Sequence, residues 1–178
     1  MTEASVVICA DTLDRWDDLN AAIASVRRQT CPAREIILVV DNDEALLERA
    51  RRGIEGVVVT PNINVRGLCG GRTTGAGLAS APVMAFLDDD AIADERWLDE
   101  LLMPYADPRV LGVGGRLEPL WRKPRPSWFL YAENRLPGKP NPARGSLAFQ
   151  KPRPSHRLSK SLGQTLAAQV GRIPRCVF

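Results

Sequence analysis

The chain has 178 residues, of which 44% are hydrophobic and 25% are charged. This length suits one domain, or one domain with an extension, and the hydrophobic content excludes a chain that is disordered throughout. The net charge of +3 conceals a split: residues 1–118 carry 12 Arg, no Lys and 20 Asp or Glu, whereas residues 119–178 carry 12 Lys or Arg and a single Glu. We therefore predict a folded unit over residues 1–120 and a separate Pro- and Arg-rich segment over residues 121–178.

The four cysteines are scattered and form no Cys-x-x-Cys pair, which is typical of reduced thiols in a cytoplasmic protein. No apolar run reaches the roughly 20 residues that a membrane span needs, and the first residues lack the basic and apolar pattern of a signal peptide. We expect a cytoplasmic protein without a nucleic-acid partner. The basic last third leaves open a peripheral contact with the inner membrane surface.

Short apolar runs alternate with amphipathic stretches along the first 120 residues. Strands are predicted at residues 5–10, 35–41, 57–60, 83–87 and 110–118, and helices at residues 14–29, 43–52, 72–80 and from 94 onward. Asp14, Asp43 and Asp94 are the predicted helix N-caps. This alternation predicts an α/β fold, a Rossmann-like and mostly parallel sheet with helices on both faces. Beyond residue 121, prolines interrupt nearly every candidate element, although a short helix over residues 158–170 is compatible with the pattern.

Acidic residues follow three of the predicted strands. Asp11 follows the first strand, Asp41 ends the second, and residues 88–90 form an Asp-Asp-Asp run after the fourth. In open parallel sheets, ligands bind beyond the carboxyl ends of the strands. We therefore expect these acids to converge on one site.

The acidic run has a predictable geometry. Side chains of a strand alternate between its faces, so Asp88 and Asp90 should share a side while Asp89 points away. Two like charges at that distance need a cation or hydrogen-bond donors, and carboxylate oxygens suit Mg²⁺ or Mn²⁺ bound together with substrate phosphates. Two alternatives stay open: acids that only solvate the turn, and the Asp-x-Asp nucleophile pattern of haloacid-dehalogenase-like phosphohydrolases. A dinucleotide-binding dehydrogenase is disfavoured, because no glycine-rich turn follows the first strand.

A glycine-rich stretch at residues 67–75 precedes or opens the third helix and contains Arg72. Backbone N–H groups beside an arginine at a helix start can bind an anion. The stretch is equally compatible with a flexible connector.

Four blocks, in this order, resemble the inverting family 2 glycosyltransferases, which have the GT-A fold. The blocks are residues 6–29, residues 35–41, the loop Gly67-Leu68-Cys69-Gly70-Gly71-Arg72-Thr73-Thr74-Gly75, and the signature Phe86-Leu87-Asp88-Asp89-Asp90-Ala91. Residues 97–98 and 114–116 follow at the intervals usual in the family. The resemblance implies a nucleotide-diphosphate sugar donor, a divalent ion and transfer of the sugar to an acceptor hydroxyl.

The same resemblance implies roles for single residues. Asp90 would ligate Mn²⁺ or Mg²⁺, and the nucleotide-sugar would be bound by Ala10, Thr12, Asp41, Arg72, Asp88 and Asp89. Thr73 departs from the family pattern, because it stands where the family usually has Asn.

The family's second half usually supplies the acceptor site and a carboxylate base. Residues 134–178 contain no Asp or Glu, so Glu133 is the remaining candidate base, while Glu118 is better explained as structural. Residues 121–178 are then a partial acceptor region or a disordered tail. Two hypotheses stay open: a glycosyltransferase with a saccharide or lipid-linked acceptor, and a truncated or frame-shifted remnant that binds the donor without turnover.

Overall fold

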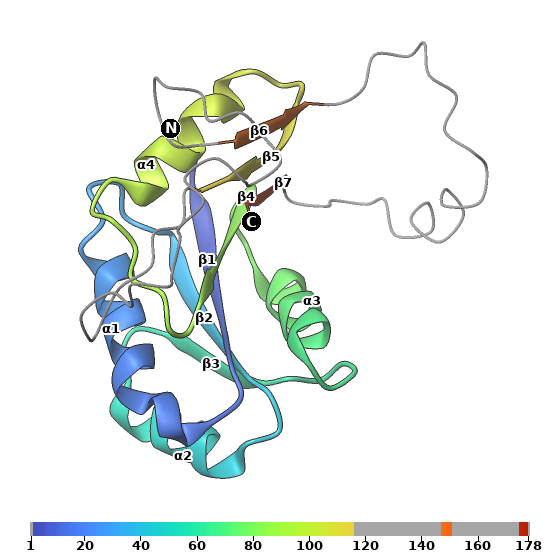
Figure 1. Ribbon diagram of the computed structural model, residues 1–178. Coiled ribbons are helices and arrows are strands. Elements are labelled where there is room, and N and C mark those ends of the chain that lie inside the picture. Colours follow the sequence, from blue (N-terminus) through green and yellow to red (C-terminus); the bar gives the residue numbers. More distant parts are fainter. Residues whose placement is uncertain (1, 116–146, 151–174, 178) are drawn as a thin grey trace, which may run out of the picture.

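The computed structural model describes residues 2–115, 147–150 and 175–177 (Figure 1). The helices are η1 (Leu13–Arg15), α1 (Trp16–Arg27), α2 (Glu44–Gly53), α3 (Leu68–Leu78), α4 (Trp97–Leu102) and η2 (Met103–Ala106). The strands are β1 (Ala4–Ala10), β2 (Glu35–Val40), β3 (Val58–Pro61), β4 (Val83–Asp88), β5 (Val110–Gly114), β6 (Leu147–Gln150) and β7 (Arg175–Val177).

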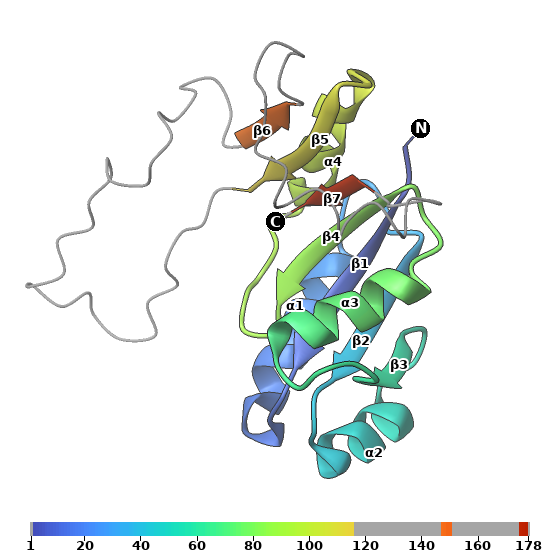
Figure 2. The same ribbon diagram turned by 90° about the vertical axis from the view of Figure 1, so that its right-hand side faces the viewer.

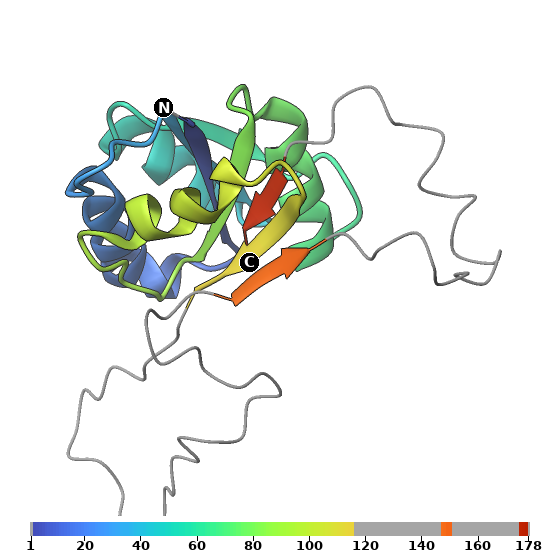
Figure 3. The same ribbon diagram turned by 90° about the horizontal axis from the view of Figure 1, so that it is seen from above.

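The strands form a seven-stranded sheet in the order β3-β2-β1-β4-β7-β5-β6. All neighbours are parallel except β5 and β6, which are antiparallel. Seen from above, β7 runs between β4 and β5, and β6 lies on the outer side of β5 (Figure 3). The α/β class with a mostly parallel sheet, as predicted from the alternating pattern, is confirmed.

The two faces of the sheet are covered differently. Alternate residues of β1, β2 and β4 pack with α1, α2 and α4 in one large core, which includes Ile8, Leu38, Leu19 and Leu98. On the other face, Val7, Ile37 and Val39 lie beneath α3. Figure 2 shows α3 crossing the sheet on the near side, with α1 behind it. The prediction of helices on both faces is therefore confirmed for the described residues.

The helix starts follow the predicted capping only in part. Asp43 caps α2 as predicted, since its Oδ1 accepts a hydrogen bond from the Leu46 N–H at 2.9 Å. The predicted Asp14 cap is wrong: Thr12 Oγ1 accepts from the Asp14 N–H, and a 3₁₀ turn precedes α1. Asp94 Oδ1 accepts from the Arg96 N–H, which shapes the turn before α4 without capping the helix itself.

The later strands differ from the sequence prediction. The fifth strand was expected over residues 110–118, but β5 ends at Gly114, and residues 116–118 lie outside the described part. β6 and β7 lie beyond the five strands predicted from the sequence. The helix suggested over residues 158–170 lies outside the described residues, as does most of the segment 121–178.

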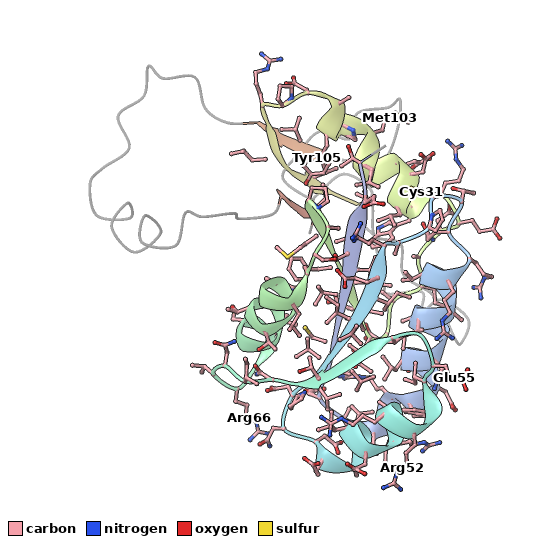
Figure 4. The ribbon with its side chains drawn as sticks, turned by 180° about the vertical axis from the view of Figure 1, so that it is seen from behind. Cys31, Arg52, Glu55, Arg66, Met103 and Tyr105 are labelled. Atoms are coloured by element: carbon pink, nitrogen blue, oxygen red, sulfur yellow. The ribbon has the colours of Figure 1, made fainter. Side chains whose placement is uncertain are left out.

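Within the described residues, no helix combines the length and the apolar character that a membrane crossing requires. Cys9, Cys31 and Cys69 are free thiols, and Cys31 lies where α1 leads towards β2 (Figure 4).

Candidate functional site

The acids singled out in the sequence lie at the carboxyl edge of the parallel sheet. Ala10 ends β1 and pairs with Val40 at the end of β2, and Cys9 pairs with Asp88 at the end of β4. Asp41 continues from β2 and donates its backbone N–H to the Ala10 carbonyl at 2.8 Å. The register therefore brings the ends of β1, β2 and β4 to one edge, as the expectation for a doubly covered sheet requires.

Asp41 organises the loop between β3 and α3. Its Oδ1 accepts a hydrogen bond from Asn62 Nδ2 at 2.6 Å, and its Oδ2 accepts from the Gly67 N–H at 2.7 Å. Asn62 Oδ1 in turn accepts from Thr74 Oγ1 at 2.9 Å, and Thr74 Oγ1 accepts from Asn64 Nδ2 at 2.9 Å. These bonds tie the carboxylate, the loop and the buried face of α3 into one network.

A pocket of about 280 Å³ opens beside this network. Its walls come from the end of β2, the start of α2 and the loop after β3, and include Asp41, Asp43, Leu47, Asn64 and Arg66. Arg66 stands on the loop at the α3 side of this edge (Figure 4). A polar pocket lined by one cation and three carboxylates (Glu44 is the third) can bind a hydrogen-bonding ligand such as a nucleoside.

Arg72 reaches the acidic strand end from α3. Its guanidinium lies 5.5 Å from the centre of the Phe86 ring and places Nη2 3.4 Å from Asp88 Oδ1. The stacking and the ion pair hold a positive charge beside an exposed carboxylate. This charge is available to an anionic group of a ligand at the same edge.

Asp89 bonds to Arg15 whereas Asp88 bonds to Arg72, so these two acids point to different sides, as predicted. The predicted shared side of Asp88 and Asp90 stays a prediction, since β4 ends at Asp88 and residues 89–90 form a turn. The Asp89 side chain is 8% exposed, and its Oδ2 accepts from Arg15 Nε at 3.0 Å. Arg15 also pairs with Asp11 at 2.5 Å. Burial raises the pKa of the Asp89 carboxyl, and the charge of Arg15 opposes that rise. Arg15 thus anchors the middle acid of the run to the start of α1.

Asp90 is exposed, and no hydrogen bond or salt bridge to another described residue engages its carboxylate. The described residues contain no cluster of three or more His, Cys, Asp or Glu side chains that could hold a metal ion by themselves. Mg²⁺ and Mn²⁺ commonly bind through one or two carboxylates together with ligand phosphates, so no such cluster is needed. The carboxylates of Asp88 and Asp90 are exposed and are of the chemical type that binds a divalent ion in that way.

The pKa of the Cys9 thiol depends on the charged groups at this edge of the sheet. Burial raises its pKa to about 11; Arg72 opposes the rise, and Asp88, Asp41 and Asp89 add to it. Cys9 is therefore a neutral, half-buried side chain at physiological pH, with three carboxylates and one guanidinium acting on it.

Several site residues were missed in the sequence. Asn62, Thr74 and Arg15 fix the site through contacts with residues that are 12 to 74 positions away in the chain. Asn62 follows a strand and could have been suspected on that ground alone. Among the predicted residues, Thr12 caps the turn before α1, Thr73 bonds to its own helix at the Cys69 carbonyl, and Glu133 lies outside the described part.

Comparison with known proteins identifies the family. The sequence profile described as "Glycosyl transferase family 2" matches residues 5–150. The chain is 34% identical over 131 residues to the glucosyl-dolichyl phosphate glucuronosyltransferase of Haloferax volcanii, a match that covers 71% of this chain and 42% of that protein. It is 35% identical over 121 residues to polypeptide N-acetylgalactosaminyltransferase 11 of Xenopus tropicalis, covering 61% of this chain and 20% of the relative.

Solved structures are similar over part of the chain. The crystal structure of S. aureus TarS 1-349 superposes with a TM-score of 0.48 at 19% identity, covering 67% of this chain and 39% of that one. The chain therefore spans less than half of the length of each of these relatives. The profile match favours the glycosyltransferase interpretation of the Asp-x-Asp run over the phosphohydrolase alternative.

Proposed function

Because this chain belongs to the family 2 glycosyltransferases, we propose that it binds a nucleotide-diphosphate sugar at the carboxyl edge of its GT-A-type sheet. The sugar is transferred to an acceptor hydroxyl with inversion. One observation carries the proposal: Asp41 and Asp88 lie at this edge beside Arg72, and the carboxylates of Asp88 and Asp90 at the end of β4 are exposed to a ligand.

The roles follow from the positions of the side chains. Asp41 lines the 280 Å³ pocket on the nucleoside side, and Ala10 and Thr12 follow at the end of the adjacent strand β1. Asp88 is proposed to bind the ribose, and Arg72, which pairs with Asp88, is proposed to bind the diphosphate. Asp89 contributes by fixing the run against Arg15.

Asp90 is the proposed ligand of Mn²⁺ or Mg²⁺, and Asp88 is the neighbouring carboxylate. When bound, the ion offsets the negative charge that builds on the diphosphate as the sugar–phosphate bond breaks. Arg72 adds a second positive charge beside Asp88. The buried Asp89–Arg15 pair keeps the third acid from competing for the ion.

The acceptor is proposed to be a saccharide or a lipid-linked sugar. Support comes from the Haloferax relative, whose name describes a lipid-linked glucose. A carboxylate base would take the proton of the attacking hydroxyl, and Glu133 is the candidate within this sequence. A cytoplasmic location with peripheral membrane contact is proposed from the charge of residues 119–178, and flotation with anionic vesicles in low and high salt tests it.

The test of donor binding uses the full chain and a panel of UDP, GDP, ADP, CDP and dTDP, titrated with and without Mn²⁺. At least one should bind in a Mn²⁺-dependent manner. Asp90→Ala should weaken binding in Mn²⁺ by about 100-fold or more, because a direct ligand is lost, and leave the circular dichroism spectrum unchanged.

The matched control is Glu55→Ala, which removes one exposed negative charge at the amino-terminal end of β3 (Figure 4). It should retain the affinity of the unaltered chain. Equal Mn²⁺-dependent affinity in the Asp90→Ala variant and the control would overturn the metal assignment.

A second candidate is a domain that binds the nucleotide-sugar without turnover. It is favoured by the lack of any Asp or Glu in residues 134–178, where the family's base is expected. Donor binding without transfer to a panel of saccharide and lipid-linked acceptors supports this candidate, and any transfer excludes it. Reading the coding DNA in its other frames beyond residue 128 adds a separate test of a frame shift.

A further inference from the structure

We propose that Ser25 and Gln29 are positioning residues that fix Asp90 for the divalent ion. This inference rests on the proposed function of the acidic strand end. Both residues lie at the end of α1 or just beyond it and bond to the segment that leads from Asp90 to α4. Figure 1 shows this segment running along α1.

Ser25 holds the segment to α1 by a hydrogen bond at Ala93. Its side-chain oxygen accepts a hydrogen bond from the Ala93 N–H at 3.0 Å and donates to the Ala22 carbonyl at 2.7 Å. Ser25 is 1% exposed, so water cannot replace it as the partner of that N–H. Losing the hydroxyl leaves a buried donor unpaired, and the backbone at Ala93 must move to find another partner.

Gln29 holds the next turn in place through both the oxygen and the nitrogen of its side-chain amide. Its Oε1 accepts from the Leu98 N–H at 2.8 Å, and its Nε2 donates to the Asp94 carbonyl at 2.5 Å. The same Nε2 lies 3.2 Å from the Ser25 carbonyl, and Gln29 is 7% exposed. The Thr30 N–H adds a bond to the Glu95 carbonyl at 2.8 Å. The segment is thus held to α1 and to the residues just after it by bonds at Ala93, Asp94, Glu95 and Leu98.

The other end of the segment is pinned by the Asp89–Arg15 pair. Only residues 90–92 lie between the Asp89–Arg15 pair and the Ala93–Ser25 hydrogen bond. The Ala91 N–H closes a turn on the Asp88 carbonyl at 3.1 Å. Arg15 and Ser25 both belong to the continuous helical stretch of η1 and α1, so both ends of the segment are attached to the same part of the fold. Only three residues separate the two attachments, so a shift at Ala93 is passed through residues 91–92 to Asp90.

These contacts fix a backbone segment next to the proposed metal ligand, whereas ordinary core contacts pack apolar side chains together. Asp90 itself has no side-chain partner among the described residues, so its place is set by the backbone on either side. Groups that hold a metal ligand in place typically change metal affinity by about 10- to 100-fold when they are removed. Ser25 and Gln29 act through the backbone that carries the ligand, so we expect an effect at the lower end of that range.

The experiment compares two buried serines. Ser25→Ala removes the acceptor of the hydrogen bond from the Ala93 N–H. Ser5→Ala is the matched control: Ser5 is 0% exposed, its Oγ accepts from the Ala81 N–H at 3.0 Å, and it lies at the amino-terminal end of the sheet. For the full-length chain, the affinity of the best-binding nucleoside diphosphate of the panel is measured with and without Mn²⁺, alongside the thermal midpoint.

Both variants should lower the thermal midpoint, but only Ser25→Ala should weaken the Mn²⁺-dependent affinity, by about 10-fold, with the metal-free affinity unchanged. In the Asp90→Ala background, Ser25→Ala should have no further effect on the Mn²⁺ dependence, because it acts through Asp90. If Ser25→Ala does not fold, Gln29→Met, which keeps the side-chain volume and loses the bonds, serves the same comparison.

The outcomes separate this inference from the proposed function. If the unaltered chain shows no Mn²⁺-dependent nucleotide binding, the proposed function fails and the inference fails with it. If it does show that binding, and Ser25→Ala behaves as Ser5→Ala, the proposed function stands and the positioning role is overturned. An equal loss with and without Mn²⁺ also overturns it, because it indicates general destabilisation.

Discussion

Arg15 is the single residue on which the geometry of the acidic run depends most directly. It is 40% exposed, whereas its partner Asp89 is 8% exposed, so removing the guanidinium leaves a carboxylate without compensation. We expect Arg15→Met to lower the free energy of unfolding by about 2 kcal/mol at neutral pH. The matched control is Arg52→Met, because Arg52 forms an ion pair with Glu48 that is solvent-exposed. Urea denaturation measures both (Figure 4 shows Arg52).

The pH dependence of the stability lost in Arg15→Met tests whether Asp89 is the cause of that loss. The pKa of Asp89 is raised by burial above 3.8, so its ionised form costs stability at neutral pH, and that cost disappears as the pH falls through the folded pKa. The deficit of Arg15→Met relative to the unaltered chain should therefore shrink on acidification. A deficit that is constant down to the acid range would contradict this explanation.

At this scale the sequence predicted the acids but not their partners. The two-residue period of a strand was enough to separate Asp89 from Asp88, and the structure gives them Arg15 and Arg72 respectively. Ser25 and Gln29 look like ordinary polar residues of an amphipathic helix. Their role depends on residues 65 to 69 positions away, and no periodicity shows such contacts.

At the scale of elements, α3 packs closely on the sheet because glycines face β1. A Cβ at Gly75 would lie 2.3 Å from Val7 Cγ1, whereas a Cβ at Gly77, two residues on, would meet nothing within 4 Å. We expect Gly75→Ala to destabilise the fold by about 2 kcal/mol through overpacking. Gly77→Ala should stabilise it by up to about 1 kcal/mol, because alanine favours the helix. Equal effects of the two substitutions on the thermal midpoint would refute this packing.

Element boundaries were predicted where local chemistry decides them. Asp43 is recognisable as an N-cap because its side chain bonds within the same turn. The start of α1 was mispredicted, since Thr12, rather than Asp14, accepts the first bond and a 3₁₀ turn intervenes. The loop before α3 could be recognised as glycine-rich, but its shape follows from Asp41, whose bonds to Asn62 and Gly67 cross from another strand.

At the scale of the whole molecule, the alternation of strands and helices was sufficient to predict a parallel sheet, but it could not give the strand order. β7 illustrates the difficulty: three residues near the end of the chain lie between β4 and β5, which belong to its first two thirds. A strand this short has no periodicity to detect, and its neighbours are determined by tertiary pairing. The change in charge after residue 118 shows that the composition changes, without indicating this return to the sheet.

β7 should therefore join the outer strands to the rest of the sheet. Deleting residues 175–178 removes the backbone partners of Met84 and Val113 and leaves two facing strand edges unpaired. We expect hydrogen-exchange protection of the β4 and β5 amides to fall by about 2 kcal/mol or more, because several backbone bonds are lost together. The amides shared by β1 and β2 are the internal control, since both strands keep their partners. Protection that falls equally in all four strands would mean that β7 stabilises the domain as a whole, and unchanged protection would mean that it is not part of the sheet in solution.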